Sequence, residues 1–222
     1  MASAGAAWAV RGRSSAAFGP SVWRGARSKS IALTFDDGPS PWTPRFVDLL
    51  AEYRAPATFF QVGTNVLRHP DIARTVRAAG HEIGNHSHTH RNFALKPSSL
   101  IDDDFTRAQT VIGETTGVRP VLLRAPYGVR WFGFRRMQAK LGLTGVMWSV
   151  IGLDWKLPAA AIADRVLSRV RGGGIVCLHD GRGTQMNPDA SASLEAVRRL
   201  VPALTGAGYH FETVSQLLCQ QL

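Results

Sequence analysis

Short apolar runs alternate with amphipathic stretches from residue 31 to the end of the chain. Seven of the apolar runs are typical of β-strands, at 31–35, 57–61, 82–84, 121–124, 144–148, 174–178 and 209–213. Seven stretches have helical spacing, at 43–53, 71–79, 98–115, 132–141, 159–171, 191–205 and 215–222. This alternation predicts an α/β fold with a parallel sheet and right-handed crossovers. Periodicity alone leaves open whether the sheet is doubly wound or an incomplete barrel.

The length of 222 residues suits a single domain. Residues 1–28 are rich in Ala, Gly, Ser and Arg without sustained periodicity. We therefore expect a flexible or surface-wrapping N-terminal lead-in over 1–28, followed by one folded domain over 29–222. The cysteines, Cys177 and Cys219, form no C-x-x-C pair, and we expect both to be buried, with a single disulfide between them left open.

The net charge of +10 favours encounter with anionic surfaces. The basic residues are spread along the chain, and no zinc-finger, RNP-type or helix-turn-helix motif accompanies them, so we expect no nucleic-acid partner. No apolar run approaches the roughly 20 residues of a membrane span. The apolar stretch 2–10 precedes its positive charges, whereas a signal peptide has them first, so no clear signal peptide is present.

Polar clusters follow the C-terminal ends of five predicted strands, which is the rim where βα barrels gather their catalytic residues. In the first cluster, Asp36 and Asp37 lie side by side between an apolar strand and a Gly-Pro break. Alone, this pattern also fits a turn that caps the next helix.

The second cluster holds three of the seven histidines within five positions. If the segment turns helically, His86 and His90 share a face and His88 points elsewhere, whereas an extended segment would put all three on one side. Imidazole is a common Zn²⁺ ligand, so this cluster favours a metal site over a polar surface loop, with His88 the least suited to be a ligand.

Three further clusters are weaker when taken singly. Arg124 precedes a Pro-Tyr-Gly turn at Tyr127 that can aim a backbone N–H at a developing oxyanion. Asp154-Trp155 follows the fifth strand, and His179 ends the sixth. A histidine at a strand end, oriented by a carboxylate, suits a general acid.

Together and in this order, the clusters resemble the five motifs of the carbohydrate esterase family 4 polysaccharide deacetylases, over roughly residues 30–215. The resemblance implies a single-domain, distorted (β/α)7 barrel with one divalent metal. It also implies that Asp37, His86 and His90 are the metal ligands. One departure is Ile151, where many members carry another Asp, and it bears on loop detail or substrate fit.

The resemblance further implies the roles of the remaining site residues: Asp36 as general base oriented by Arg124, His179 as general acid paired with Asp154, the Tyr127 N–H at the oxyanion, and Trp155 with Leu178 around the acetyl methyl. Three protein ligands leave coordination positions free for water and the amide carbonyl. Water on such a metal ionises near pH 7, and a protonated His179 would let the amine leave.

We therefore expect a metal-dependent hydrolase that removes N-acetyl groups from N-acetylglucosamine residues of a polysaccharide such as peptidoglycan or chitin. The positive charge slightly favours peptidoglycan. Zn²⁺ is the default cofactor, and Co²⁺, Mn²⁺ or Ni²⁺ suit the same ligands. Alternatives are the same chemistry on a small amino-sugar conjugate or O-acetyl xylan, and a non-catalytic basic glycan-binding module. The substrate class suggests secretion or a cell-envelope location.

Overall fold

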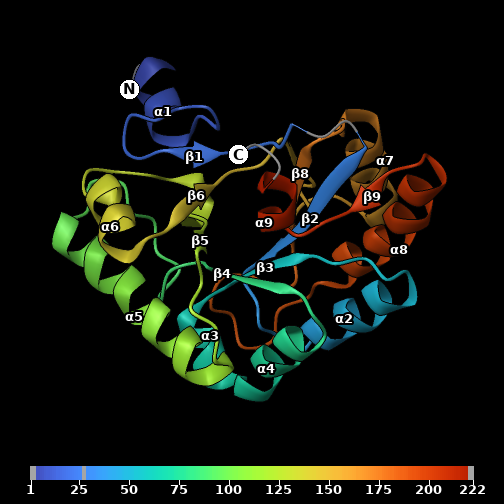
Figure 1. Ribbon diagram of the computed structural model, residues 1–222, viewed down its shortest axis with the longest axis horizontal. Helices are drawn as coiled ribbons and strands as arrows, with labels where there is room; N and C mark the ends of the chain where they lie inside the picture. The colour runs from blue at the N-terminus through green and yellow to red at the C-terminus, as the bar shows by residue number, and fades with distance from the viewer. Residues whose placement is uncertain (1–3, 27–28, 220–222) are drawn as a thin grey trace.

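The computed structural model describes residues 4–26 and 29–219 and shows a curved parallel sheet surrounded by helices (Figure 1). The strands are β1 (Ser21–Val22), β2 (Ser30–Asp36), β3 (Thr58–Gln61), β4 (Glu82–Asn85), β5 (Leu122–Leu123), β6 (Thr144–Val146), β7 (Val150–Ile151), β8 (Gly174–His179) and β9 (His210–Phe211). Their order is β1-β6-β5-β4-β3-β2-β8-β7, with β9 paired to the start of β2. Every pair of named strands is parallel, which confirms the expected distorted barrel.

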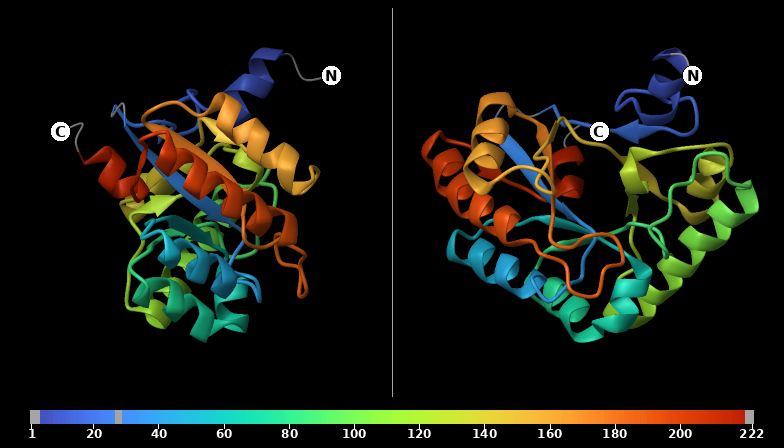
Figure 2. Two further views of the ribbon diagram at one scale, coloured as in Figure 1. Left: turned by 90° about the vertical axis from the view of Figure 1, so that its right-hand side faces the viewer. Right: turned by 180° about the vertical axis from the view of Figure 1, so that it is seen from behind.

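The helices cover the outer side of the sheet, apart from the first helix of the chain, which lies beyond β1, and the last, which packs against the inner side (Figures 1 and 2). They are α1 (Ala4–Arg11), α2 (Thr43–Glu52), α3 (Gly63–Arg68), α4 (Pro70–Ala78), α5 (Ser98–Thr116), α6 (Phe134–Leu141), α7 (Ala159–Arg169), α8 (Ser191–Gly206) and α9 (Val214–Leu218), with one 3₁₀ turn at η1 (Pro126–Gly128). α5 ends at Gly117, whose φ of 69° lies in the left-handed region that glycine adopts freely. In the described part of the chain, no helix has the length and apolar character needed to cross a membrane.

Successive side chains of the central strands point alternately to the outer core, under the helices, and to the interior of the barrel. Ile31, Leu33 and Phe35 of β2 belong to the large core under the outer helices, where each fully buried side chain contributes roughly 1.5–3 kcal/mol. Ala32 belongs to a second cluster with Ile175 of β8, closed by residues of α9. Because side chains alternate between faces, Asp36 and His179 continue the interior face and emerge at the C-terminal rim.

The N-terminal segment joins the sheet earlier than expected. β1 pairs with β6, and Arg24 forms an antiparallel bridge with Gly174 at the start of β8. The buried guanidinium of Arg130 holds the segment by donating to the carbonyl oxygens of Gly12 and Ser15. Residues 1–3 and 27–28 of the expected lead-in lie outside the described residues.

Several element boundaries correct the expectations. The predicted strands 121–124, 144–148 and 209–213 are shorter here, and β1, β7, α1 and α3 were not predicted. The predicted helix 215–222 is observed as α9, while residues 220–222 lie outside the described chain. Cys177 is buried as expected, but Cys219 is exposed, and both thiols are free.

Candidate metal centre and active site

A carboxylate and two imidazoles converge where β2 and β4 end. Asp37 follows β2 directly, while His86 and His90 follow β4. Oδ1 of Asp37 lies 3.4 Å from Nε2 of His86 and 2.8 Å from Nε2 of His90. One potential ligand atom from each residue lies within 4.8 Å of the others. The three ligands expected from the sequence are thus brought together, whereas His88 turns its ring toward Gly63 at the start of α3.

The hydrogen bonding of His86 shows that this cluster fits a cation. Its Nδ1 lies 2.8 Å from the carbonyl oxygen of Arg124, which can only accept, so Nδ1 carries the hydrogen. Nε2 therefore turns its lone pair toward Asp37 Oδ1, a buried oxygen that no hydrogen-bond donor of good geometry reaches among the described residues. Two acceptors facing each other at 3.4 Å match ligands that share one tetrahedral ion, whose separation is about 3.4 Å for bonds of about 2.1 Å.

The surroundings of Asp37 also favour its ionised form, which is the form that binds a cation. Its burial alone would favour the neutral acid, but the contacts with His86 and His90 and the charge of His179 keep the pKa of this carboxyl well below its usual range. Asn65 fixes the backbone here, because its amide donates to the carbonyl oxygens of Asp37 at 2.8 Å and Gly183 at 2.7 Å.

Asp36 points into the barrel and pairs with Arg124. The guanidinium Nη1 donates at 2.7 Å both to Asp36 Oδ1 and to Thr34 Oγ1. Arg124 is fully buried and packs over the ring of Phe60, 4.2 Å from the ring centroid. A buried charge needs such partners, and the pair holds Asp36 Oδ1 toward Arg124.

His179 and Asp154 form a second buried pair on the other side of the site. Asp154 Oδ1 lies 2.8 Å from Nδ1 of His179, and Oδ2 accepts from the His179 backbone N–H at 2.8 Å and from the Ser193 hydroxyl. Burial alone would lower the pKa of His179, but Asp154, together with Asp37 and Asp36, raises it to about 9. For Asp154 the same contact, with help from Ser193, outweighs burial and lowers its pKa. The Nδ1 contact leaves Nε2 free to face the cavity.

Strained backbone is concentrated around the site. Asp37, Ser87, His90 and Tyr127 have φ values of 75°, 66°, 51° and 58°, a region that residues with a Cβ adopt at a cost. Surrounding contacts hold these conformations. Oδ1 of Asp104 on α5, for example, accepts from two backbone N–H groups within the histidine loop, that of residue 88 at 2.6 Å and that of residue 89 at 3.1 Å.

These groups line one cavity of about 630 Å³. The cavity walls hold the carboxylates of Asp36 and Asp37 and the imidazoles of His86, His90 and His179. The other side chains on the walls include Tyr127, Trp148, Ile151, Trp155, Cys177, Arg11 and Arg182. Trp155 is 51% exposed, and its ring meets the His179 ring edge to face at 5.3 Å. A cavity of this size, in which charged and polar groups converge beside aromatic side chains, is typical of a small-ligand site.

Leu178 does not line this cavity, which corrects the expectation that it forms the acetyl pocket. Its side chain is fully buried in the outer core. Because residues alternate along β8, the neighbours Cys177 and His179 face the interior and line the cavity in its place.

Sequence reasoning missed several residues that hold the site. Asn65 and Ser193 lie on helices, and Asp104 was counted only as part of a helix, since a single polar residue on a helix carries no signal of its partner. Arg11 was assigned to the lead-in, yet its Nε donates to the carbonyl oxygen of Tyr127 at 3.2 Å. Arg182 donates to the carbonyl oxygen of Asp154 at 2.9 Å.

Asp180, beside His179, is not part of the cavity wall and instead hydrogen-bonds to the segment that follows β2. Its Oδ2 accepts from the Thr43 hydroxyl at 2.5 Å, and its carbonyl oxygen accepts from the Ser40 hydroxyl at 2.5 Å. Burial, with the charge of Asp37 nearby, raises the pKa of Asp180 to about 7. These contacts connect the loop after β8 to the loop after β2.

Comparison with known proteins places the chain among deacetylases. Residues 24–146 match the family described as polysaccharide deacetylase. The chain is 38% identical over 199 residues to a chitooligosaccharide deacetylase of Bradyrhizobium sp. (strain ANU 289), covering 86% of this chain and 91% of that protein. It is 36% identical over 194 residues to a peptidoglycan-N-acetylglucosamine deacetylase of Bacillus cereus, covering 86% and 88%.

Solved structures share the fold closely. A peptidoglycan N-acetylglucosamine deacetylase in complex with 4-naphthalen-1-yl-N-oxidanyl-benzamide matches with a TM-score of 0.83 and 28% identity, covering 89% of this chain and 92% of that one. A CE4 family pseudoenzyme from Bacillus anthracis matches with a TM-score of 0.81 and 25% identity, covering 90% and 70%. Fold alone therefore does not establish activity, and the site residues carry that argument. By its sequence profile and its relatives, the chain belongs to the polysaccharide deacetylase family of hydrolases.

Proposed function

We propose that this protein is a metal-dependent deacetylase that hydrolyses the N-acetyl group of N-acetylglucosamine residues in a polysaccharide. The observation that carries the proposal is the meeting of three groups in one cavity: the Asp37, His86 and His90 cluster, the Asp36–Arg124 pair and the His179–Asp154 pair. The names of the relatives support the amide of an acetylated amino sugar as the bond that is cleaved.

Asp37, His86 and His90 would hold the cation, because they offer one buried carboxylate oxygen and two imidazole nitrogens. When bound there, a divalent cation supplies a Lewis acid that polarises the amide carbonyl and makes water easier to deprotonate. Zn²⁺ is our first choice for this ligand set, and Co²⁺, Mn²⁺ and Ni²⁺ fit the same donors.

Asp36 would act as general base, taking the proton of the attacking water, while the Arg124 hydrogen bond keeps its carboxylate oriented. The Tyr127 backbone N–H would donate to the amide oxygen as that oxygen gains negative charge. His179 would then protonate the leaving amine from Nε2, since its Nδ1 is committed to Asp154. A pKa of about 9 keeps His179 protonated at neutral pH, as this role requires.

Trp155 would form one wall of the acetyl pocket, because it borders the cavity beside His179. Residues 29–222 would make up the catalytic domain, with the lead-in over 1–28 wrapping its surface. The net charge of +10 favours an anionic polymer, so we place peptidoglycan ahead of neutral chitin. Such a substrate implies secretion or a cell-envelope location.

The test is acetate release by chelated protein and by protein reloaded with one equivalent of Zn²⁺, from chitooligosaccharides and from peptidoglycan fragments. We expect release only after reloading, and faster release from peptidoglycan. Release from O-acetyl xylan alone would replace the N-acetyl substrate with an ester. Failure to release acetate from any substrate, with glycan binding intact, would favour a non-catalytic glycan-binding module.

A further inference from the structure

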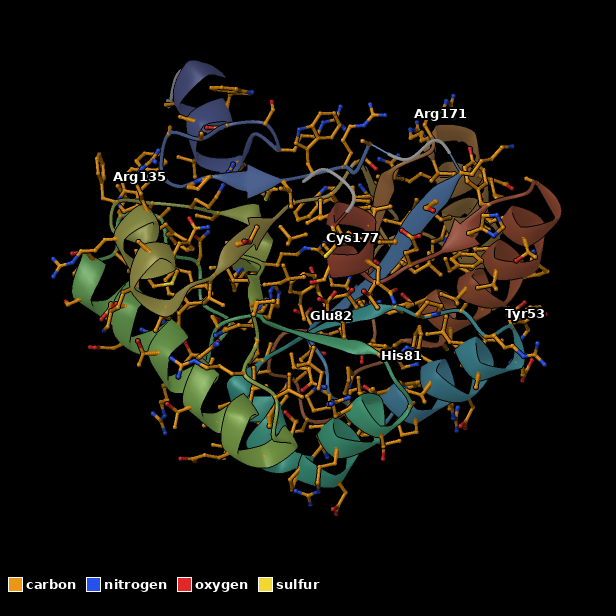
Figure 3. All side chains as sticks on the ribbon, viewed as in Figure 1. Tyr53, His81, Glu82, Arg135, Arg171 and Cys177 are labelled. Carbon is orange, nitrogen blue, oxygen red and sulfur yellow. The ribbon has the colours of Figure 1, made fainter. Side chains whose placement is uncertain are left out.

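Cys177 is a nucleophilic side chain in the active-site cavity that the proposed reaction does not use. Figure 3 shows Cys177 on β8. Because His179 follows two residues later on the same strand, both side chains lie on one face, and both line the cavity. The Cys177 side chain is 1% exposed, and its Sγ lies 3.5 Å from Oδ2 of Asp36.

Asp36, Cys177 and His179 form a second group of three metal-ligand types. One oxygen, one sulfur and one ring nitrogen from them lie within 4.8 Å of one another. A tetrahedral Zn²⁺ with a sulfur at about 2.3 Å and an oxygen at about 2.1 Å separates those two ligands by about 3.6 Å. The observed separation of Sγ and Oδ2, 3.5 Å, matches that geometry. Asp154 holds Nδ1 of His179, which orients the ring as outer partners orient histidine ligands.

The sulfur distinguishes this group from the Asp37, His86 and His90 cluster, which has only nitrogen and oxygen donors. Thiolate ligands favour soft cations, whereas imidazole and carboxylate accept a wider range. Burial and the neighbouring Asp36 raise the pKa of the Cys177 thiol well above its usual range, so the free thiol stays protonated and unreactive.

We propose that Asp36, Cys177 and His179 form a second, inhibitory site for thiophilic divalent cations, represented by Cd²⁺ and by excess Zn²⁺. This proposal rests on the proposed function, because the cation would occupy the general base and the general acid together. Binding forms a metal–sulfur bond to Cys177 and a metal–nitrogen bond to Nε2 of His179, and it releases to solvent both the thiol proton and the proton that Nε2 carries.

Two positive charges make the second site weaker than the first. Arg124 already pairs with the other oxygen of Asp36, at 2.7 Å. A cation held by Asp37, the next residue along the chain, would also repel a second one. We therefore expect the second site to fill only after the first, so that one equivalent of metal activates and more inhibits.

The test uses a Cys219→Ser background, because Cys219 is the exposed thiol and would otherwise bind added metal. Protein carrying one equivalent of Zn²⁺ is titrated with Cd²⁺ while the ultraviolet thiolate-to-cadmium absorption and acetate release are followed together. Cys177→Ser and Cys177→Ala are compared in the same background, each rate being normalised to that variant without Cd²⁺. Both substitutions of Cys177 are made so that the test still gives a result if one of the two variants does not fold.

We expect the thiolate absorption and the inhibition to rise together in the background protein. Replacing Cys177 should abolish the absorption and raise the half-inhibitory Cd²⁺ concentration by at least about tenfold. Even the loss of a residue that only hydrogen-bonds to a metal ligand typically lowers metal affinity about tenfold, and Cys177 would be a ligand itself. Absence of the absorption at saturating Cd²⁺, or inhibition unchanged without the thiol, would overturn the proposal. Protein that binds Cd²⁺ through Cys177 but never releases acetate would instead overturn the proposed function.

Discussion

Replacing Asp154 with asparagine isolates the electrostatic contribution to the His179 site. The side chains have nearly the same shape, so the change removes the negative charge 2.8 Å from Nδ1 while keeping an oxygen acceptor there. In the wild-type protein this charge, together with those of Asp37 and Asp36, overcomes burial and raises the pKa of His179 from 6.5 to about 9. The difference corresponds to roughly 3 kcal/mol of preference for the imidazolium.

Without that charge, burial is opposed only by the weaker contributions of Asp37 and Asp36, so the pKa of His179 should fall toward 6.5. At pH 8 the protonated fraction should then drop from about nine-tenths toward a few per cent, by the definition of these pKa values. The measurement is an NMR titration of the histidine rings in metal-free protein, with pH–rate profiles recorded in parallel. The alkaline limb of the rate profile should move to lower pH. Asp164→Asn, at an exposed position on α7, is the control and should move neither.

Stability should change with pH in the same sense. A pKa raised by folding contributes stability that is fully present below pH 6.5 and is lost as the pH rises through about 9. Wild-type protein should therefore lose more free energy of unfolding over that window than Asp154→Asn does, by an amount on the order of 2–3 kcal/mol. A wild-type His179 pKa near 6.5, or one that Asp154→Asn leaves unchanged, would refute this reasoning.

Three further predictions follow from particular contacts. Asp36→Asn should keep bound Zn²⁺ yet lower turnover by orders of magnitude, whereas His86→Ala should lose both, as metal analysis and acetate release will show; near-normal turnover would remove Asp36 from the base role. Arg11→Ala should lower kcat several-fold by loosening Tyr127, whose backbone N–H is the proposed oxyanion donor, while Arg13→Ala, whose guanidinium donates to a carbonyl oxygen at residue 149, should not; equal effects would contradict this. Burial lowers the pKa of His81 to about 4, so the free energy of unfolding measured in urea should be highest above pH 6.5 and fall by roughly 2–3 kcal/mol toward pH 4. His81→Gln should lose less stability over that range, and an equal loss in the variant would contradict the assignment to His81.

The sequence was sufficient to predict the elements whose pattern is local. Long amphipathic helices such as α5 and the buried strand β2 were predicted because their periodicity spans many residues. The strands β1 and β7 have two residues each, too few to show any period, and they form because β6 and β8 present partners to them.

Candidate site residues were predictable where a strand runs into a polar cluster, as at Asp37 and His86. The face of a strand was not predictable in β8, because the strand is buried on both sides and lacks alternation of polar and apolar residues. The resemblance alone placed Leu178 at the pocket, and nothing in the pattern of β8 indicated that Cys177 lines the cavity. Contacts that cross the fold, such as Asn65 to the Asp37 backbone and Arg11 to Tyr127, leave no trace in local sequence.

The central claim is that Asp37, His86 and His90 share one cation beside the reacting amide. Anomalous X-ray diffraction from crystals soaked with one equivalent of Zn²⁺ tests it most directly. We predict a single anomalous peak bonded to Oδ of Asp37 and to Nε2 of both histidines, at about 2.0–2.2 Å. A dominant peak elsewhere, with these three side chains still in contact only with each other, would contradict the account.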